Sequence, residues 1–315
     1  MKIIVKKTTE LCSKDKDDIC ELFERVFHVV KTNKEFVHQF EKNEFGYSYF
    51  GLIYDDDKLI GSYAVIPLKF NYHKEELIFA QSIDTMIAKE YRGNPFLLKK
   101  LAEKVYKELK EDSIPFIFGF PNDNIYLVRK KILKWKDISN LDIHVLPIKI
   151  GAIKKKLSPF TYVFSFLPKI LNIFINKQKQ AEVVFPIHKS QTPIFEEYRF
   201  SDEYIKIILS KDTYSYYKIK EFKDIKTAFI VEVYPLTKNN IELTVKKICQ
   251  SEENIDLIAY FGFLPFSLIN LFKIPIKYKP KNTFMSGRIL DNEKIGLDVF
   301  DIKNWRVNLS NFDWI

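Results

Sequence analysis

One stretch of the chain, residues 81–122, constrains the fold most, because two kinds of hydrophobic spacing meet there around a tight turn. The strand-like run QSIDTMIA leads to the turn Arg92-Gly93-Asn94-Pro95, and a long amphipathic segment follows. Within that segment Leu, Ala and Val recur at spacings of three and four, the pattern of a helix with one buried face. A second apolar run, IPFIFGFPN, predicts another strand. The stretch therefore predicts a strand, a turn, a helix and a strand.

The turn has the chemistry of a helix N-terminus. Asn94 can cap the helix, because its side-chain oxygen accepts from a free N–H of the first turn. Pro95 suits the first helical position, where its missing N–H costs little. A strand that runs straight into such a turn aims several backbone N–H groups at one point, which suits a phosphate or pyrophosphate. A generic strand-to-helix junction is the alternative, since it has the same local chemistry.

The first half of the chain predicts further elements on both sides of this stretch. Those before it are a strand, two helices and a three-stranded meander, at Ile3–Val5, Asp15–Val30, Lys34–Glu41, Tyr47–Tyr54, Lys58–Phe70 and Glu76–Ala88. After it, Asn122 or Asn124 can cap a helix that runs to Leu133, and a strand follows at Leu141–Ile150. The predicted order is strand, helix, helix, three strands, helix, strand, helix and strand.

That order, with a phosphate turn between the fourth strand and the third helix, resembles the GNAT (Gcn5-related N-acetyltransferase) superfamily. The resemblance covers roughly residues 1–150 and is carried by QSIDTMIA, by Glu90-Tyr91-Arg92-Gly93 and by IPFIFGFPN. It implies an α/β (α+β) fold with a mixed, mostly antiparallel central sheet flanked by helices. Arg92 and Gly93 fit the family's turn, whereas Pro95 and Leu97 stand where two small residues are usual.

Length and composition agree with a globular protein that is long enough for two domains. The 315 residues are 46% hydrophobic and 29% charged, enough for two cores. Three cysteines provide no disulfide framework, and MKIIVKKTTE lacks the apolar run of a signal peptide, so we expect a cytoplasmic location. The five histidines have no metal-ligand spacing, so we expect no metal. Sequence motifs of a nucleophilic enzyme or a dinucleotide-binding fold do not occur either.

The net charge of +9 favours an acidic ligand without choosing one, because CoA, nucleotide sugars and RNA are all polyanions. Nothing in the sequence has the pattern of a DNA-recognition motif, so DNA is not an expected partner.

The second half divides from the first at residues 151–181, where basic residues flank the apolar run 157–175. This segment is either a connecting helix or a peripheral membrane contact. Residues 182–315 then repeat the strand–helix–strand order at Thr227–Tyr234, Asn240–Cys249 and Ile255–Phe261, without an Arg-Gly turn. We expect a GNAT-like domain at 1–150, a linker at 151–181 and a degenerate second lobe at 182–315. A hairpin is also expected from Thr283–Leu290 and Ile295–Phe300.

The resemblance implies roles for several residues. The backbone of Met86, Ile87 and Ala88 would contact the pantetheine arm and thioester of acetyl-CoA. Arg92, Gly93, Asn94, Phe96 and Leu97 would form the pyrophosphate turn, and Asn122 and Asn124 would touch the cofactor. Asp84 is the candidate base and Tyr126 the candidate acid. The alternative for Asp84 is a surface or hairpin carboxylate, and the alternative for Tyr126 is a core or rim tyrosine. The family's usual tyrosine lies further along that helix, about where Lys130 stands.

The implied activity is transfer of an acetyl group from acetyl-CoA to the primary amine of a small acceptor by direct attack. An amino sugar or nucleotide amino sugar is the expected acceptor class. Two alternatives stay open: a related two-lobed transferase that uses aminoacyl-tRNA, which the net charge and the missing small residues favour, and a non-catalytic binding protein that kept the fold.

Overall fold

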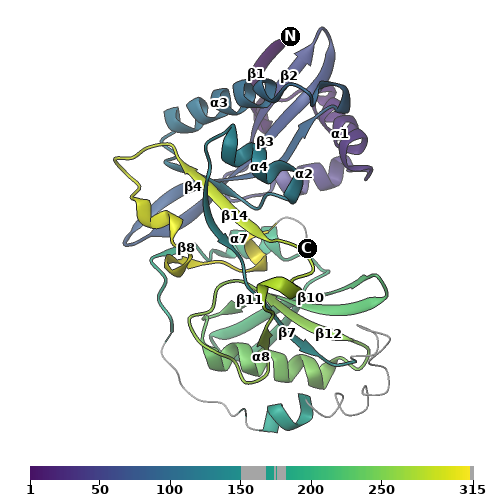
Figure 1. The fold of residues 1–315 in the computed structure, drawn as a ribbon, viewed down its shortest axis with the longest axis vertical. Helices are drawn as coiled ribbons and strands as arrows, with labels where there is room; N and C mark the ends of the chain where they lie inside the picture. The colour runs from purple at the N-terminus through teal and green to yellow at the C-terminus, as the bar shows by residue number, and fades with distance from the viewer. Residues whose placement is uncertain (150–167, 174, 176–181, 313–315) are drawn as a thin grey trace. The chain divides into compact units, whose positions relative to one another are not determined.

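The computed structural model describes residues 1–149, 168–173, 175 and 182–312, which belong to two compact units (Figure 1). The first unit comprises Met1–Asn140, Pro186–Arg199 and Asn282–Trp305. The second comprises Leu141–Phe185, Phe200–Lys281 and Arg306–Ile315. Both units are discontinuous in sequence, and they therefore differ from the contiguous domains expected at 1–150 and 182–315.

The first unit is built on a nine-stranded sheet whose main path runs β1-β2-β3-β4-β5-β14-β6, with β8 and β15 off this path. The strands are β1 Lys2–Lys7, β2 Tyr49–Asp55, β3 Lys58–Tyr72, β4 Glu75–Ile87, β5 Phe116–Gly119, β6 Lys136–Asn140, β8 Ile187–Lys189, β14 Phe284–Ile289 and β15 Trp305–Arg306. The helices are α1 Ser13–Phe27, α2 Asn33–Glu41, α3 Pro95–Glu111, α4 Asp123–Lys131 and α7 Pro193–Arg199. Along the main path every neighbouring pair of strands is antiparallel except β4 and β5. These two strands are parallel, and α3 connects them in the sequence.

Two neighbouring residues of β2 show that helices cover both faces of this sheet. Phe50 stacks against Phe36 of α2, with ring centroids 5.5 Å apart. Gly51 points the other way, because successive strand residues face opposite sides. A Cβ on Gly51 would lie 2.6 Å from Val105 and 2.8 Å from Leu101, so glycine is what lets α3 approach this strand closely. The fold class expected from the sequence is confirmed: a mixed, mostly antiparallel sheet between helices.

An aromatic cluster holds the middle strands of this sheet together. The ring of Trp305 lies 5.7–5.9 Å from those of Phe70, Phe79, Phe116 and Phe118, which belong to β3, β4 and β5. All five side chains are buried. The place where β4 and β5 pair is therefore among the most firmly packed parts of the unit.

The second unit has a six-stranded sheet in the order β13-β7-β12-β11-β10-β9. Its elements are β7 Ile143–Pro147, β9 Ile205–Ser210, β10 Thr213–Phe222, β11 Ile225–Tyr234, α8 Lys238–Ser251, β12 Leu257–Phe261 and β13 Phe272–Lys273. Only β11 and β12 are parallel, and α8 connects them. The sequence β9-β10-β11-α8-β12 thus repeats the connectivity of β2-β3-β4-α3-β5, the repeat that the Thr227–Phe261 pattern predicted.

Two strand expectations are confirmed only in part. The strand expected at Leu141–Ile150 is β7, but it belongs to the second unit, where it pairs with β12. The expected hairpin does not form either: β14 inserts between β5 and β6, and Leu297–Phe300 is a 3-10 helix. Local turn signals at Asp291 cannot reveal such long-range partners, because the strands they pair with lie more than a hundred residues away.

Most of the segment that the sequence marked as a linker or membrane contact lies outside the described residues, including 157–167 and 174. Within the described part of the chain, no helix combines the length and the apolar character needed to cross a bilayer.

Candidate active site

Strands β4 and β5 separate in the middle of the first unit and leave a fork. Their pairing consists of Phe79 with Phe116, Ala80 with Ile117 and Gln81 with Phe118. β4 continues to Ile87, and beyond Gln81 no described strand pairs with it on the β5 side. One edge of residues 82–87 is therefore not paired with any described strand.

A bulge interrupts β4 directly after the fork. On β3, Ala64 pairs with Ile83 and Ser62 pairs with Met86, so Asp84 and Thr85 together oppose one residue. Asp84 adopts a φ of +41°, a left-handed conformation that aspartate tolerates better than most residues. Bulges of this kind redirect side chains and are common beside active sites. The bulge thus orients the Asp84 side chain differently from a side chain at the same position of a regular strand.

Lys31, in the connection between α1 and α2, holds the Asp84 carboxylate. Its ammonium donates to Asp84 Oδ2 and, at 2.6 Å, to Gln39 Oε1. It also lies 4.0 Å from the centroid of the Phe23 ring. The two side chains of the ion pair are 9% and 14% exposed. No described residue donates to Asp84 Oδ1, so this oxygen can accept a hydrogen bond or a proton from a ligand.

The turn after β4 forms as the sequence predicted. A 3-10 turn at Lys89–Tyr91 leads to Asn94, whose side chain accepts from Phe96 N at 3.1 Å and caps α3. Arg92 Nε donates to Ile87 O at 2.9 Å, which ties the turn back to β4. Gly93 has no atom within 4 Å of its Cβ position, and its N–H has no acceptor among the described residues. The turn is therefore open at Gly93.

The two departures from the family's turn pattern do not fill this opening. Leu97 is 9% exposed, so its side chain packs under the turn, while its N–H donates to Asn94 O at 3.2 Å. Pro95 occupies the first position of α3, where no N–H is needed. Phe96, by contrast, is 62% exposed beside the turn. Bulk at position 97 is thus directed into the core.

The predicted residues of the next helix have local roles in the structure. Asn122 caps α4 by accepting from Asn124 N at 3.1 Å and Ile125 N at 3.2 Å. Tyr126 stacks on Phe284, with centroids 3.9 Å apart, and its hydroxyl lies 3.3 Å from Lys130 Nζ. No hydrogen bond among the described residues joins Tyr126 to Asp84.

Sequence reasoning missed Arg129, which lies in the fork. The side chain is buried, and Nη2 donates to Ser82 Oγ at 3.0 Å, before the bulge, and to Thr85 Oγ1 at 3.3 Å, within it. In the basic run Arg129-Lys130-Lys131 it looked like part of a solvated helix end. The available signal was spacing, since Arg129 stands four residues before the buried Leu133.

The second unit repeats the fork, but a later segment of the chain, residues 306–310, lies against it. Pairing of β11 and β12 stops at Ile230 and Tyr260, and a bulge lies at the same level of β11. Beyond that point the buried Glu232 accepts hydrogen bonds from Arg306, Asn308 and Ser310, each at 2.8 Å. A Cβ on Gly262, which follows β12, would meet Val307 O at 2.2 Å. Residues 306–310 therefore contact both arms of this fork.

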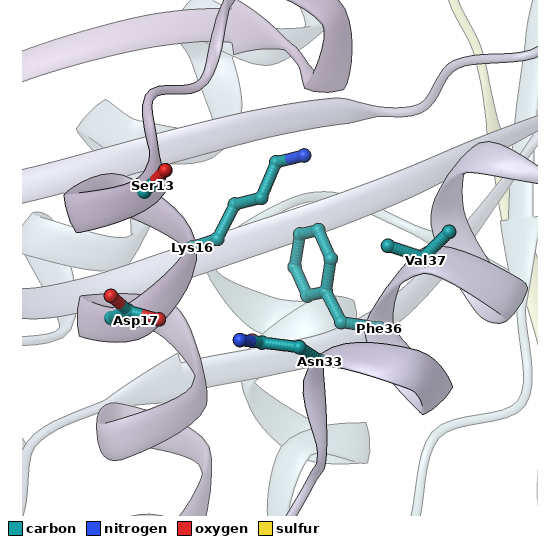
Figure 2. A pocket seen from close by; sticks show the side chains of 6 residues that line it. All are labelled: Ser13, Lys16, Asp17, Asn33, Phe36 and Val37. Carbon is teal, nitrogen blue, oxygen red and sulfur yellow. The ribbon is translucent and has the colours of Figure 1, made fainter.

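A small pocket lies elsewhere in the first unit, between α1 and α2 (Figure 2). It has a volume of about 160 Å³ and is lined by Ser13, Lys16, Asp17, Asn33, Phe36 and Val37. Pockets for small-molecule substrates usually hold about 300–1,000 Å³. None of the fork or turn residues lines it, so we place the candidate site at the fork and not in this pocket. The described residues contain no cluster of side chains that could hold a metal ion.

Comparison with known protein families gives a match within the first unit. Residues 7–129 match the model of the acetyltransferase (GNAT) domain family. A GCN5-related N-acetyltransferase from Anabaena variabilis ATCC 29413 has a TM-score of 0.58 and 14% identity, over 91% of this chain and 73% of that one. A probable N-acyltransferase from Enterococcus faecalis V583, a conserved protein of unknown function, has a TM-score of 0.61 and 14% identity, over 95% and 74%.

A GCN5-related N-acetyltransferase from Kribbella flavida is also similar in structure, with a TM-score of 0.59 and 11% identity over 92% of this chain and 72% of that one. At these identities the likeness concerns the fold. No curated protein matches the sequence significantly.

Proposed function

The chain belongs to the GNAT superfamily and is an acyltransferase of the GNAT type, and from this premise we propose that its first unit transfers an acetyl group from acetyl-CoA to the primary amine of a small acceptor. One observation carries the proposal: β4 is bulged at Asp84, unpaired on its β5 side after Gln81, and leads into a capped turn that is open at Gly93. A strand edge and an N-terminal helix turn are what an extended thioester with a pyrophosphate needs.

The residues of this site have separable tasks in the proposed reaction. When bound, acetyl-CoA supplies an activated acyl group. The backbone of Met86, Ile87 and Ala88 would align the pantetheine arm, and the turn around Gly93 would bind the pyrophosphate. Holding the thioester in line with an incoming amine removes much of the entropic barrier to a two-substrate reaction. Asp84 Oδ1 would accept the proton that the attacking nitrogen loses.

The arrangement around Asp84 supports an amine acceptor. The carboxylate is fixed by Lys31 through Oδ2, which leaves Oδ1 directed by the bulge and without a donor from the described residues. An ammonium or amine N–H is the natural partner of such an oxygen. An amino sugar or nucleotide amino sugar is the acceptor class that we propose to test first.

Binding of the cofactor can be tested before the acceptor is known. We expect acetyl-CoA to raise the melting temperature of the protein and to bind in isothermal titration. Gly93→Glu should abolish both effects, because the added carboxylate would stand where the pyrophosphate binds. Gly93→Ala is the matched control, since its methyl group meets no atom within 4 Å and should leave the fold intact.

Three results distinguish this proposal from its alternatives. Binding of acetyl-CoA that Gly93→Glu removes supports it, and a panel of amines then reports turnover as release of free CoA. Stabilisation by aminoacyl-tRNA but by no acyl-CoA would support the tRNA-dependent alternative. Absence of stabilisation by either would leave a binding protein that kept the fold, and would reject the acetyltransferase proposal.

A further inference from the structure

The fork between β4 and β5 contains a buried positive charge. Arg129 is 4% exposed, and its guanidinium lies 4.6 Å from the Trp135 ring centroid. A Cβ on Gly119, the last residue of β5, would lie 2.7 Å from Arg129 Nη1 and 2.7 Å from Ser82 O. The absence of that Cβ leaves the space in which the guanidinium sits, at the point where the two strands separate.

This charge has no carboxylate partner among the described residues. Nη2 donates to two hydroxyl groups, those of Ser82 and Thr85, while Nε and Nη1 are buried without a hydrogen-bond partner in the described part of the chain. A guanidinium stays protonated at every accessible pH, so it cannot escape burial by losing its proton. A buried cation with two unused donor groups is an unfavourable arrangement in the free protein, and an anion bound in the fork would relieve it.

We propose that Arg129 stabilises the thiolate of CoA as it leaves the acyl group. This inference rests on the proposed function, which places the thioester beside the bulge at Asp84 and Thr85. In the transfer the amine nitrogen forms a bond to the carbonyl carbon, and the C–S bond breaks with its electron pair going to sulfur. The attacking nitrogen gives its proton to Asp84 Oδ1, and the thiolate later takes a proton from solvent. Arg129 supplies charge and no proton.

The surrounding groups favour this role for Arg129. Lys31 and Asp84, the other charged residues at this part of β4, neutralise each other as an ion pair. Tyr126, the candidate acid, stacks on Phe284 and is hydrogen-bonded to Lys130, which in turn pairs with Asp137. Among the described residues, the unpaired charge in the fork is therefore that of Arg129, which is buried, and a fixed cation in a buried site acts strongly on a developing anion.

The test measures the thiol pKa of CoA bound to the protein, which requires no acceptor and no turnover. Thiolates absorb in the ultraviolet more strongly than thiols, so a pH titration of the CoA complex minus that of the desulfo-CoA complex reports this one thiol. An opposite charge within a few ångströms lowers a pKa by about 1–3 units. We expect such a lowering in the wild-type protein, its loss in Arg129→Met and its partial retention in Arg129→Lys.

Arg25→Met is the matched control, because it removes from the same unit a guanidinium whose one hydrogen bond to a described residue is to Leu59 O, at 3.1 Å. It should keep the lowered thiol pKa. If Arg129→Met does not fold, the wild-type and Arg129→Lys titrations decide the question alone. A wild-type complex whose thiol titrates like free CoA overturns the proposal, as does Arg129→Met with an unchanged lowered pKa.

Two further results would reject the proposal for different reasons. If Arg129→Met weakens binding only of acyl-CoAs that carry a carboxylate and leaves the thiol pKa alone, the guanidinium binds an acyl carboxylate and the thiolate role is wrong. If CoA does not bind the wild-type protein at all, the proposed function itself fails and this inference fails with it.

Discussion

Replacing Gly119 by alanine tests the packing of the fork with a single methyl group. The new Cβ would lie 2.7 Å from Arg129 Nη1 and 2.7 Å from Ser82 O. The guanidinium could move aside, but the carbonyl belongs to β4, whose core residues are packed around Trp305. Forcing a methyl group into such a site typically destabilises a protein by about 1–3 kcal/mol. The φ of Gly119 is not left-handed, so this cost is steric.

Gly93→Ala is the reference for this measurement, since it makes the same chemical change at a position with nothing within 4 Å. Both substitutions restrict the unfolded chain alike, a gain of about 0.4–1 kcal/mol that cancels in their difference. Urea unfolding of the two variants should therefore differ by about 1–3 kcal/mol, with Gly119→Ala the less stable. Equal unfolding midpoints at equal slopes would show that the fork has room at Gly119 and would refute its close packing against Arg129.

Three further predictions concern buried ionisable groups. Lys31→Met should destabilise the protein by about 3–5 kcal/mol, because it leaves the mostly buried carboxylate of Asp84 unpaired, and Asp84→Asn in the same chain should restore part of this loss in urea unfolding. Glu232→Gln should lower the free energy of unfolding by a similar amount, because it leaves the buried charge of Arg306 without its carboxylate. The affinity for acetyl-CoA should not change, and a loss of affinity would contradict a cofactor site confined to the first unit. Burial lowers the pKa of His144 to about 4, against about 6.5 when unfolded, so the unfolded chain binds the extra proton between these values. Stability should be full above about pH 6.5 and fall by about 3 kcal/mol towards pH 4, and His144→Gln should lack this part of the pH dependence in paired urea titrations.

The local elements of the site were predictable because short-range rules determine them. Asn94 and Pro95 begin α3 as expected, since a cap and a proline at the first position act within a few residues. The alternation and apolar content of β4 and β5 placed both strands. The fold class, an α/β sheet of the GNAT type, followed from the order of these elements and is confirmed.

Long-range partners were not predictable in the same way. β14 and β7 pair with strands far away in sequence, and no local pattern selects among edges of similar hydrophobicity. The bulge at Asp84 left no trace in the sequence, because one extra residue in a long apolar strand does not disturb its composition. Arg129 was hidden for a related reason: a basic residue at a helix end usually faces water, and only the fork explains its burial. The individual site residues stay predictions.

Hydrogen exchange of the backbone amides, measured with and without acetyl-CoA, tests the central claim most directly. If the cofactor lies along the free edge of β4 and binds at the open turn, amides of residues 82–98 should become protected when it is added. The corresponding edge of β11 at residues 231–234 should not change, because the segment at 306–310 already contacts that fork. Protection at β11, or none at residues 82–98 under saturating acetyl-CoA, would contradict the account.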